Sequence, residues 1–175
     1  MDHLQQWFND QAIDRFVKII INKYHYKKAP LCILDLCCGY GLTTLTLRDR
    51  LIKNGVEIEK IVGYDVSEDM ISFDQGKNQY YPQVDFRKKN IEAELDDVAQ
   101  YDVAYCLFGL HWMNDLDHVM YCINRSLKPR GIFLSLTPIE IRDLFDMRTA
   151  FVNNSRWTDA IGVEARTLHP FHYDE

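Results

Sequence analysis

The chain has 175 residues, of which 47% are hydrophobic, and this length supports one domain with a sizeable core. Its formal net charge of −6 at pH 7 argues against nucleic acid or a membrane surface as a partner, because both are bound through concentrated positive charge. The five cysteines form no C-x-x-C pair, and no signal peptide or long apolar run occurs, so we expect reduced thiols, no metal site and a cytoplasmic protein.

The first predicted element is a helix in the N-terminal segment, residues 1–30. Apolar side chains recur there at helical spacing, and Pro30 ends the pattern. The residues that follow this spacing are Ile13, Phe16, Val17, Ile20 and Tyr24. The pattern predicts an amphipathic helix that covers one face of a sheet.

A predicted strand over residues 31–36 leads into a glycine loop, and helical spacing resumes at residue 42. Gly39 and Gly41 would let backbone N–H groups approach a nucleotide-like ligand at the start of that helix. Thr44 stands where the dinucleotide-binding fingerprint has its third glycine. Asp35 would repel a pyrophosphate but attract a cationic ligand, so the loop favours a ligand with an ammonium or sulfonium group over NAD.

A second predicted strand, residues 61–65, ends in Asp65. Ser67 follows as a helix N-cap, with two acidic residues in the first helical turn. Asp65 lies near the interval of about 20 residues at which doubly wound nucleotide-binding folds place a carboxylate on the ribose hydroxyls. We therefore expect Asp65 to bind a ribose.

Three further strands are predicted, over residues 84–87, 101–107 and 131–137. A helix over residues 116–127 precedes a turn at residues 129–131 and the last strand. Strands that alternate with helices predict an α/β fold, a Rossmann-like doubly wound sheet of five parallel strands with flanking helices. The ligand of such a sheet lies beyond the carboxyl ends of the strands, where the chain has Asp35, Asp65, Asn90 and Leu107.

The order of these elements over residues 30–138 resembles the class I S-adenosylmethionine (SAM) methyltransferases. The run Asp35-Leu36-Cys37-Cys38-Gly39-Tyr40-Gly41 is similar to their motif I, an acid followed by x-G-x-G-x-G, with Cys37 in place of the first glycine. The resemblance implies SAM as the cofactor and S-adenosylhomocysteine (SAH) as its product. The cofactor-binding residues that it implies are Asp35, Cys37, Gly39, Gly41, Asp65, Val66, Met70, Asn90, Ile91 and Leu107.

Two further contacts follow from this resemblance. Asn90 would meet the adenine edge, for which its amide offers a donor and an acceptor. The N-terminal segment would lie over the cofactor, which makes Gln5, Gln6, Trp7 and Gln11 candidate contacts or else ordinary surface and core residues.

Residues 110–115, Leu-His-Trp-Met-Asn-Asp, resemble the Leu-His/Gln-Trp pattern of methyltransferases that act on small carboxylic acids, such as the juvenile hormone acid and malonyl-acyl-carrier-protein enzymes. This resemblance implies transfer of a methyl group to an oxygen of a small molecule. His111 and Trp112 would orient a carboxylate, and His111 would act as general base for a hydroxyl. The alternative is that His111 begins a helix and Trp112 packs in the core.

Residues 138–175 are aromatic and apolar without strand alternation, and we expect a helical segment that covers the substrate like a lid. The whole chain, residues 1–175, would then form one domain around a nucleotide-binding core at residues 31–137. It would lack the final antiparallel hairpin of the class I fold. The outer edge of the fifth strand would be covered by a second copy of the chain, a partner chain, the tail or further residues.

Two other functions remain open on the sequence. One is a catalytically silent, methyltransferase-like subunit that binds a partner, and the other is an NAD-binding or nucleotide-binding domain of the same architecture. Binding of NAD without binding of SAM or SAH would favour the second. The Asn/Asp-Pro-Pro-Tyr motif of enzymes that methylate base amines in DNA does not occur.

Overall fold

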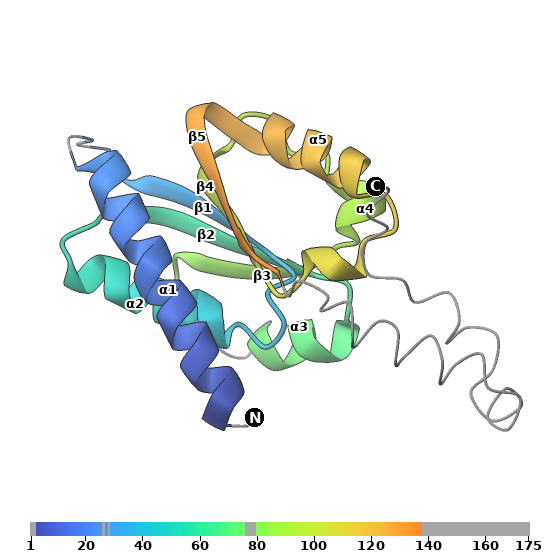
Figure 1. Ribbon diagram of the computed structural model, residues 1–175, viewed down its shortest axis with the longest axis horizontal. Helices are drawn as coiled ribbons and strands as arrows, with labels where there is room; N and C mark the ends of the chain where they lie inside the picture. The colour runs from blue at the N-terminus through green and yellow to red at the C-terminus, as the bar shows by residue number, and fades with distance from the viewer. Residues whose placement is uncertain (1–2, 26, 28, 76–79, 138–175) are drawn as a thin grey trace, which may run out of the picture.

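A computed structural model describes residues 3–25, 27, 29–75 and 80–137 of the chain (Figure 1). The elements in chain order are α1 (His3–Tyr24), β1 (Leu31–Leu36), α2 (Leu42–Lys53), β2 (Ile58–Asp65), α3 (Glu68–Gln75), β3 (Val84–Lys88), α4 (Ile91–Glu94), β4 (Tyr101–Leu107), the 3-10 turn η1 (Leu110–Trp112), α5 (Leu116–Ser126) and β5 (Leu127–Leu136). The predicted lid, residues 138–175, lies outside the described residues.

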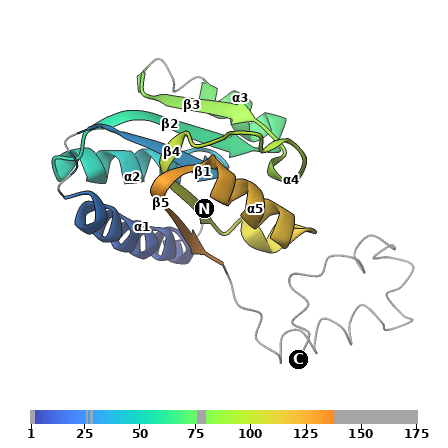
Figure 2. The same ribbon diagram turned by 90° about the horizontal axis from the view of Figure 1, so that it is seen from above.

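The five strands form one parallel sheet in the order β3-β2-β1-β4-β5, with β3 and β5 at its two edges (Figure 2). The predicted doubly wound α/β sheet is confirmed. From β1 the chain adds β2 and β3 on one side of the sheet and then β4 and β5 on the other side. The switch point therefore lies between β1 and β4. In such sheets a crevice opens at the carboxyl ends of the two strands that flank the switch point.

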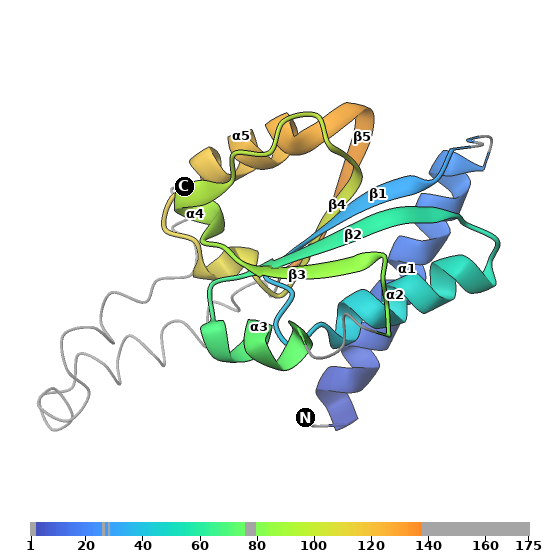
Figure 3. The same ribbon diagram turned by 180° about the vertical axis from the view of Figure 1, so that it is seen from behind.

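Helices cover both faces of the sheet, so the central strands β1 and β4 are buried on both sides (Figures 1 and 3). Successive residues of β1 point to opposite faces: Ile33 packs with α1, α2 and α3, whereas Leu34 packs with α4, η1 and α5. All six residues of β1 are buried. This explains why β1 reads as a continuous apolar run with a single acid rather than as an alternating strand.

The last helix and strand differ from the prediction. Helix α5 ends at Ser126, and β5 already begins at Leu127, whereas the sequence predicts helix to residue 127 and strand from residue 131. The predicted turn is a local irregularity inside the strand, because Tyr101 pairs with Leu127 but Val103 pairs with Ile132. Within it Arg130 has a φ of 69°.

The amino end of the sheet is closed around Asp102, at the start of β4. Asp102 is 5% exposed, and its carboxylate accepts hydrogen bonds from the backbone N–H of Cys32 at 2.9 Å, from Lys128 at 3.0 Å and from Lys27. Tyr24 donates to the Asp102 carbonyl oxygen at 2.5 Å. One residue therefore connects the ends of α1, β1, β4 and β5.

In the part of the chain that the structure describes, no helix is both long and apolar enough to cross a membrane.

Candidate active site

Asp65 ends β2 at the carboxyl edge of the sheet, and its two carboxylate oxygens organise the loops beside it. One oxygen accepts the backbone N–H of Gly39 at 2.9 Å, and the other accepts the backbone N–H of Ser67 at 2.9 Å. The carboxylate thus joins the glycine loop after β1 to the turn that begins α3. Each oxygen retains acceptor capacity for a further donor, as ribose binding would require.

A cavity of about 500 Å³ opens beside Asp65, between the ends of β1, β2, β3 and β4. This volume lies in the range of small-molecule sites, about 300–1,000 Å³. Most of the site residues proposed from the sequence line it, namely Cys37, Gly39, Asp65, Val66, Met70, Asn90, Ile91 and Trp112. Because parallel strands bring their carboxyl ends together, residues far apart in the chain converge on one cavity.

Four of the proposed residues do not line this cavity: Asp35, Gly41, Leu107 and His111. Asp35 is 1% exposed, and its carboxylate accepts hydrogen bonds from Thr44 at 2.6 Å and from Tyr105 at 2.5 Å. It therefore joins β1 to the first turn of α2 and to β4, on the face that α1 and α2 cover. The structure thus places the Asp35 carboxylate inside the packed sheet and outside the cavity lining, and its contact with a ligand stays a prediction.

The glycine loop has the backbone conformation that a close ligand contact needs. Cys37, Gly39 and Gly41 have φ values of 62°, 54° and 65°, in the left-handed region that favours glycine. A Cβ atom on Gly39 would lie 3.8 Å from the sulfur of Met70, which also lines the cavity. Gly41 is the N-cap residue of α2 and has no side chain, so no side chain at that position occupies the first N–H groups of the helix.

The groups that line the cavity fit a nucleoside. Asp65 offers a carboxylate for a ribose, and Val66, Met70 and Ile91 offer apolar walls for a base. Asn90 is the N-cap of α4, and its side-chain oxygen accepts the backbone N–H of Glu92 at 3.0 Å. This oxygen keeps a second lone pair and the amide NH₂ keeps its donors, so the contact of Asn90 with an adenine edge stays a prediction.

Glu92 lines the cavity and is hydrogen-bonded to the residues that follow His111 and Trp112. Its carboxylate accepts the backbone N–H of Asn114 at 2.7 Å and that of Asp115 at 2.9 Å, and it also contacts the Asn114 amide at 3.2 Å. Asp115 in turn caps α5 by accepting the N–H of His118 at 2.9 Å. One side chain therefore joins the segment before α5 to α4, the helix that begins after Asn90.

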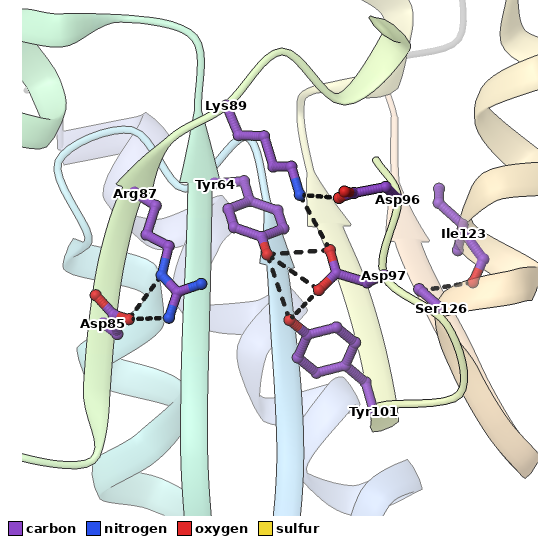
Figure 4. A network of polar contacts seen from close by, with 9 residues as sticks. All are labelled: Tyr64, Asp85, Arg87, Lys89, Asp96, Asp97, Tyr101, Ile123 and Ser126. Carbon is purple, nitrogen blue, oxygen red and sulfur yellow. Dashed lines mark hydrogen bonds and ion pairs between the residues drawn. The ribbon is translucent and has the colours of Figure 1, made fainter. Parts of the chain in front are cut away.

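Behind the cavity lies a polar network around Asp97, which is 9% exposed (Figure 4). The hydroxyls of Tyr64 and Tyr101 donate to its carboxylate at 3.0 and 3.2 Å, and Lys89 approaches it at 3.4 Å. Burial, above all, raises the pKa of both tyrosines, so they remain neutral donors. The network fixes Tyr64 and Lys89, both of which line the cavity.

Trp112 and His111 lie in η1, between the cavity and α5. Trp112 is 63% exposed and lines the cavity, so it is not a core residue. The two rings are 4.8 Å apart between centroids. The Nδ1 atom of His111 is buried and has no hydrogen-bond partner among the described residues. Burial lowers the pKa of His111, so the imidazole is neutral at pH 7 and able to accept a proton.

The N-terminal contacts proposed over the cofactor remain untested. Gln6 lies on the exposed start of α1 and borders a small hollow with Leu42 and Thr43 of α2. Trp7 is 55% exposed and stacks edge-on against Phe8. None of these residues lines the cavity beside Asp65.

Sequence reasoning missed several residues that line the cavity: Tyr64, Ser67, Lys89, Glu92, Phe108, Gly109 and Met113. Most of them are sequence neighbours of a residue that we proposed, so a search that took one more residue on each side would have included them. Glu92 also follows a proposed residue, Ile91, but its hydrogen bonds to Asn114 and Asp115 could not have been found in this way. Its role depends on contact with residues more than 20 positions further along the chain.

The comparisons with known proteins agree with this geometry. The methyltransferase domain family matches residues 33–131. An uncharacterized methyltransferase of Schizosaccharomyces pombe is 31% identical over 123 residues, which are 61% of this chain and 38% of that protein. A demethylmenaquinone methyltransferase of Leptospira interrogans is 32% identical over 114 residues, 61% of this chain and 42% of that protein.

Among solved structures, the citrinin polyketide synthase CMeT domain superposes with a TM-score of 0.59 and 26% identity, over 69% of this chain and 32% of that chain. This chain spans only about two fifths of the length of the two relatives named above.

Proposed function

This chain belongs to the methyltransferase domain family and has the class I fold of SAM-dependent methyltransferases, and from that premise we propose that it transfers the methyl group of SAM to an oxygen of a small molecule. The observation that carries the proposal is the cavity at the switch point. Asp65, the glycine loop and an apolar wall meet there, and Trp112 stands at the same cavity.

In this proposal SAM supplies an electrophilic methyl group, and the chain binds and aligns the two reactants. Asp65 would hold the ribose hydroxyls, Asn90 and Ile91 the adenine, and Cys37 and Gly39 the amino-acid end of the cofactor. Alignment of nucleophile and methyl group in a site that excludes water supplies most of the rate gain in a displacement of this kind.

The acceptor we propose is a carboxylate or a hydroxyl, in line with the resemblance of residues 110–115 to the small-carboxylic-acid methyltransferases. A carboxylate needs no base, and the N–H groups of Trp112 and His111 would orient it. A hydroxyl needs a proton acceptor, for which the neutral His111 is the candidate. The proposed lid, residues 138–175, would complete the acceptor site within a single domain of residues 1–175.

A carbon acceptor is the second candidate, and two relatives favour it. One is named a demethylmenaquinone methyltransferase, and the other is the CMeT domain of a polyketide synthase. Carbon methylation requires an electron-rich carbon next to an ionised oxygen, and a neutral His111 would serve to remove that oxygen's proton.

The first experiment measures binding of SAM, SAH and NAD to the purified chain by calorimetry. The proposal expects binding of SAM and SAH and none of NAD. Transfer of a labelled methyl group is then measured on a panel of small carboxylic acids, phenols and quinols, with the product bond identified by mass spectrometry. Binding of SAM without transfer to any acceptor would favour the silent subunit.

Trp112→Ala separates the acceptor role from the cofactor role. We expect loss of transfer with SAH affinity retained, because the indole stands at the exposed side of the cavity. Equal loss of both would place Trp112 in the cofactor site. Leu42→Ala, at an apolar side chain that is 44% exposed and does not line this cavity, is the matched control.

We also propose that β5 associates with a second copy of the chain or with a partner. Among the described strands, β5 pairs only with β4, and Ile132, Phe133 and Leu134 are half-buried. Sedimentation at micromolar concentration tests this, and a stable monomer with strong amide protection in β5 would contradict it.

A further inference from the structure

Two cysteine side chains meet beneath the glycine loop, and the function proposed above uses neither thiol. A Cβ atom placed on Gly109 would lie 2.6 Å from the Sγ of Cys37 and 2.6 Å from the Sγ of Cys106. Both sulfurs therefore lie 2.6 Å from the same point, and the distance between the two sulfurs is at most twice 2.6 Å. Because Gly109 has no side chain, the space between it and the two sulfurs remains open to them.

The backbone at this place suits a disulfide. Leu36 and Cys106 are direct partners in the parallel pairing of β1 and β4, and Cys37 is the next residue along. Neighbouring strands lie about 4.8 Å apart, and a disulfide joins Cα atoms that are about 4.4–6.8 Å apart. Cys38 does not compete, because its Sγ packs on the opposite face of the sheet, 3.0 Å from the position that a Cβ of Gly63 would take.

The two thiols differ in exposure and reactivity. Cys37 is half-buried and lines the cavity, so a small oxidant that enters the cofactor site reaches it first. Cys106 is fully buried, and its hydrogen bond with Cys37, together with burial, raises the pKa of its thiol well above the ordinary value. Cys106 is therefore protonated at neutral pH and does not compete with Cys37 for the oxidant.

We propose that Cys37 and Cys106 form a reversible disulfide when the protein meets hydrogen peroxide, and that this bond weakens cofactor binding at the adjoining cavity. The regulatory part of this inference rests on the proposed function of that cavity. The disulfide itself does not depend on it, because it follows from the position of the two sulfurs.

The reaction takes place in two steps. The sulfur of Cys37 attacks one oxygen of hydrogen peroxide, the O–O bond breaks, and Cys37 sulfenic acid and one water are formed. The sulfur of Cys106 then attacks the sulfur of Cys37, the S–O bond breaks, and the hydroxide leaves with the Cys106 thiol proton as a second water. The two thiols together lose two electrons, and the peroxide is reduced to water.

The disulfide would act on the cofactor through the loop backbone. Cys37 has a φ of 62°, and the N–H of Gly39, two residues on, donates to Asp65 at 2.9 Å. An S–S bond of about 2.05 Å draws Cys37 toward β4. The loop that carries Gly39 moves with it, which disturbs the hydrogen bond that holds the ribose-binding carboxylate.

The test treats the purified chain with hydrogen peroxide, with and without SAH, and maps its peptides without reductant by mass spectrometry. We expect a peptide that links Cys37 to Cys106, slower linkage in the presence of SAH, and at least a tenfold loss of SAH affinity that dithiothreitol restores. In Cys106→Ala the sulfenic acid on Cys37 has no partner thiol, so dimedone should trap it. In the parent chain dimedone should trap little.

Two variants complete the test. Cys37→Gly removes the first thiol and suits the left-handed backbone, so peroxide should not change its SAH affinity, whatever that affinity is before treatment. Cys32→Ser changes a thiol at the other end of β1 and keeps a donor for Glu59, so it should form the same link as the parent chain.

Absence of the linked peptide in a chain that binds SAH would overturn the disulfide and leave the proposed function intact. A linked peptide with unchanged SAH affinity would overturn the switch. Failure of the reduced chain to bind SAH, with the link still formed, would contradict the proposed function and the regulation but not the disulfide.

Discussion

At the amino end of the sheet Asp102 is enclosed by Lys27, Lys128 and the N–H of Cys32, whereas at the carboxyl end Asp65 receives two backbone N–H groups and keeps a face toward a cavity. Both are aspartates at the end of a parallel strand. Protein groups surround the first, and the second has acceptor capacity left for a ligand.

Left-handed backbone at non-glycine residues occurs at both ends, because Ala99 and Arg130 near the amino end have φ values of 50° and 69°. Cys37 and Phe108, which follow β1 and β4 at the carboxyl end, are non-glycine residues with φ values of 62° and 56°. Such conformations cost energy and persist where the surroundings hold them, often at ligand sites. The comparison of the two aspartates suggests that the amino end contributes to stability and the carboxyl end to function, and the following predictions test this division.

Asp102→Ala should have the largest effect on stability. Removing the carboxylate leaves a buried N–H and two lysines without their partner, and breaking a buried ion pair costs about 3–5 kcal/mol. Because the side chains of Lys27 and Lys128 are 29% and 34% exposed, water screens part of this loss. We expect about 2–3 kcal/mol from urea unfolding, with SAH affinity of the folded protein unchanged. Asp85→Ala, in an exposed pair with Arg87, should cost less than about 1 kcal/mol.

The same carboxylate predicts how stability depends on pH. Burial alone would raise the pKa of Asp102, but the Cys32 N–H and the two lysines outweigh it and leave the pKa lowered. A lowered folded-state pKa gives stability that is present above the unfolded value, about 3.9, and lost as pH falls through the folded value. The stability difference between the parent chain and Asp102→Asn should therefore shrink below about pH 4. A difference that grows with acid would contradict the assignment.

Asp65→Ala should have the largest effect on cofactor affinity. It removes charge-assisted hydrogen bonds to a ribose, worth about 1.5–3 kcal/mol, and the anchor of the Gly39 N–H. We expect SAH binding to weaken about tenfold to a hundredfold in calorimetry. Unchanged affinity would remove Asp65 from the cofactor site.

Glu92→Ala should loosen the segment that carries His111 and Trp112. The change removes the acceptor for the backbone N–H groups of Asn114 and Asp115, so their amide exchange should be about tenfold faster. SAH affinity should change by less than about threefold, since, among the residues that the structure describes, the hydrogen bonds of the Glu92 carboxylate go to Asn114 and Asp115 and not to Asp65 or the glycine loop. Glu68→Ala, at an exposed ion pair with Lys88, is the control and should leave these amides unaffected.

The smallest expected effect concerns His111. Burial lowers its pKa, so an NMR titration should place its midpoint below the ordinary imidazole value of about 6.5. With a hydroxyl acceptor, transfer should fall as pH drops through that midpoint, because only the neutral imidazole accepts a proton. A carboxylate acceptor should show no such fall. His111→Asn identifies the resonance and should remove the acidic limb.

Much of the architecture could be predicted because the signals are local. The apolar run before Gly39, the helical spacing of α1 and the acid that ends β2 are each set by a few neighbouring residues, and the structure confirms the elements that they predict. The bounds of β5 could not be predicted so well. Residues 127–131 read as a turn, but pairing with β4 extends the strand back to the helix.

The sequence by itself determined the order of strands and helices, the glycine loop and the position of Asp65 at a strand end. Only the tertiary structure decided that Asp35 binds Tyr105, which is 70 residues away, that Glu92 holds the segment before α5, and that Cys37 meets Cys106. The reason is the parallel sheet. Its strands join residues separated by a whole crossover, and which side chains meet there depends on register and packing, which no local pattern records.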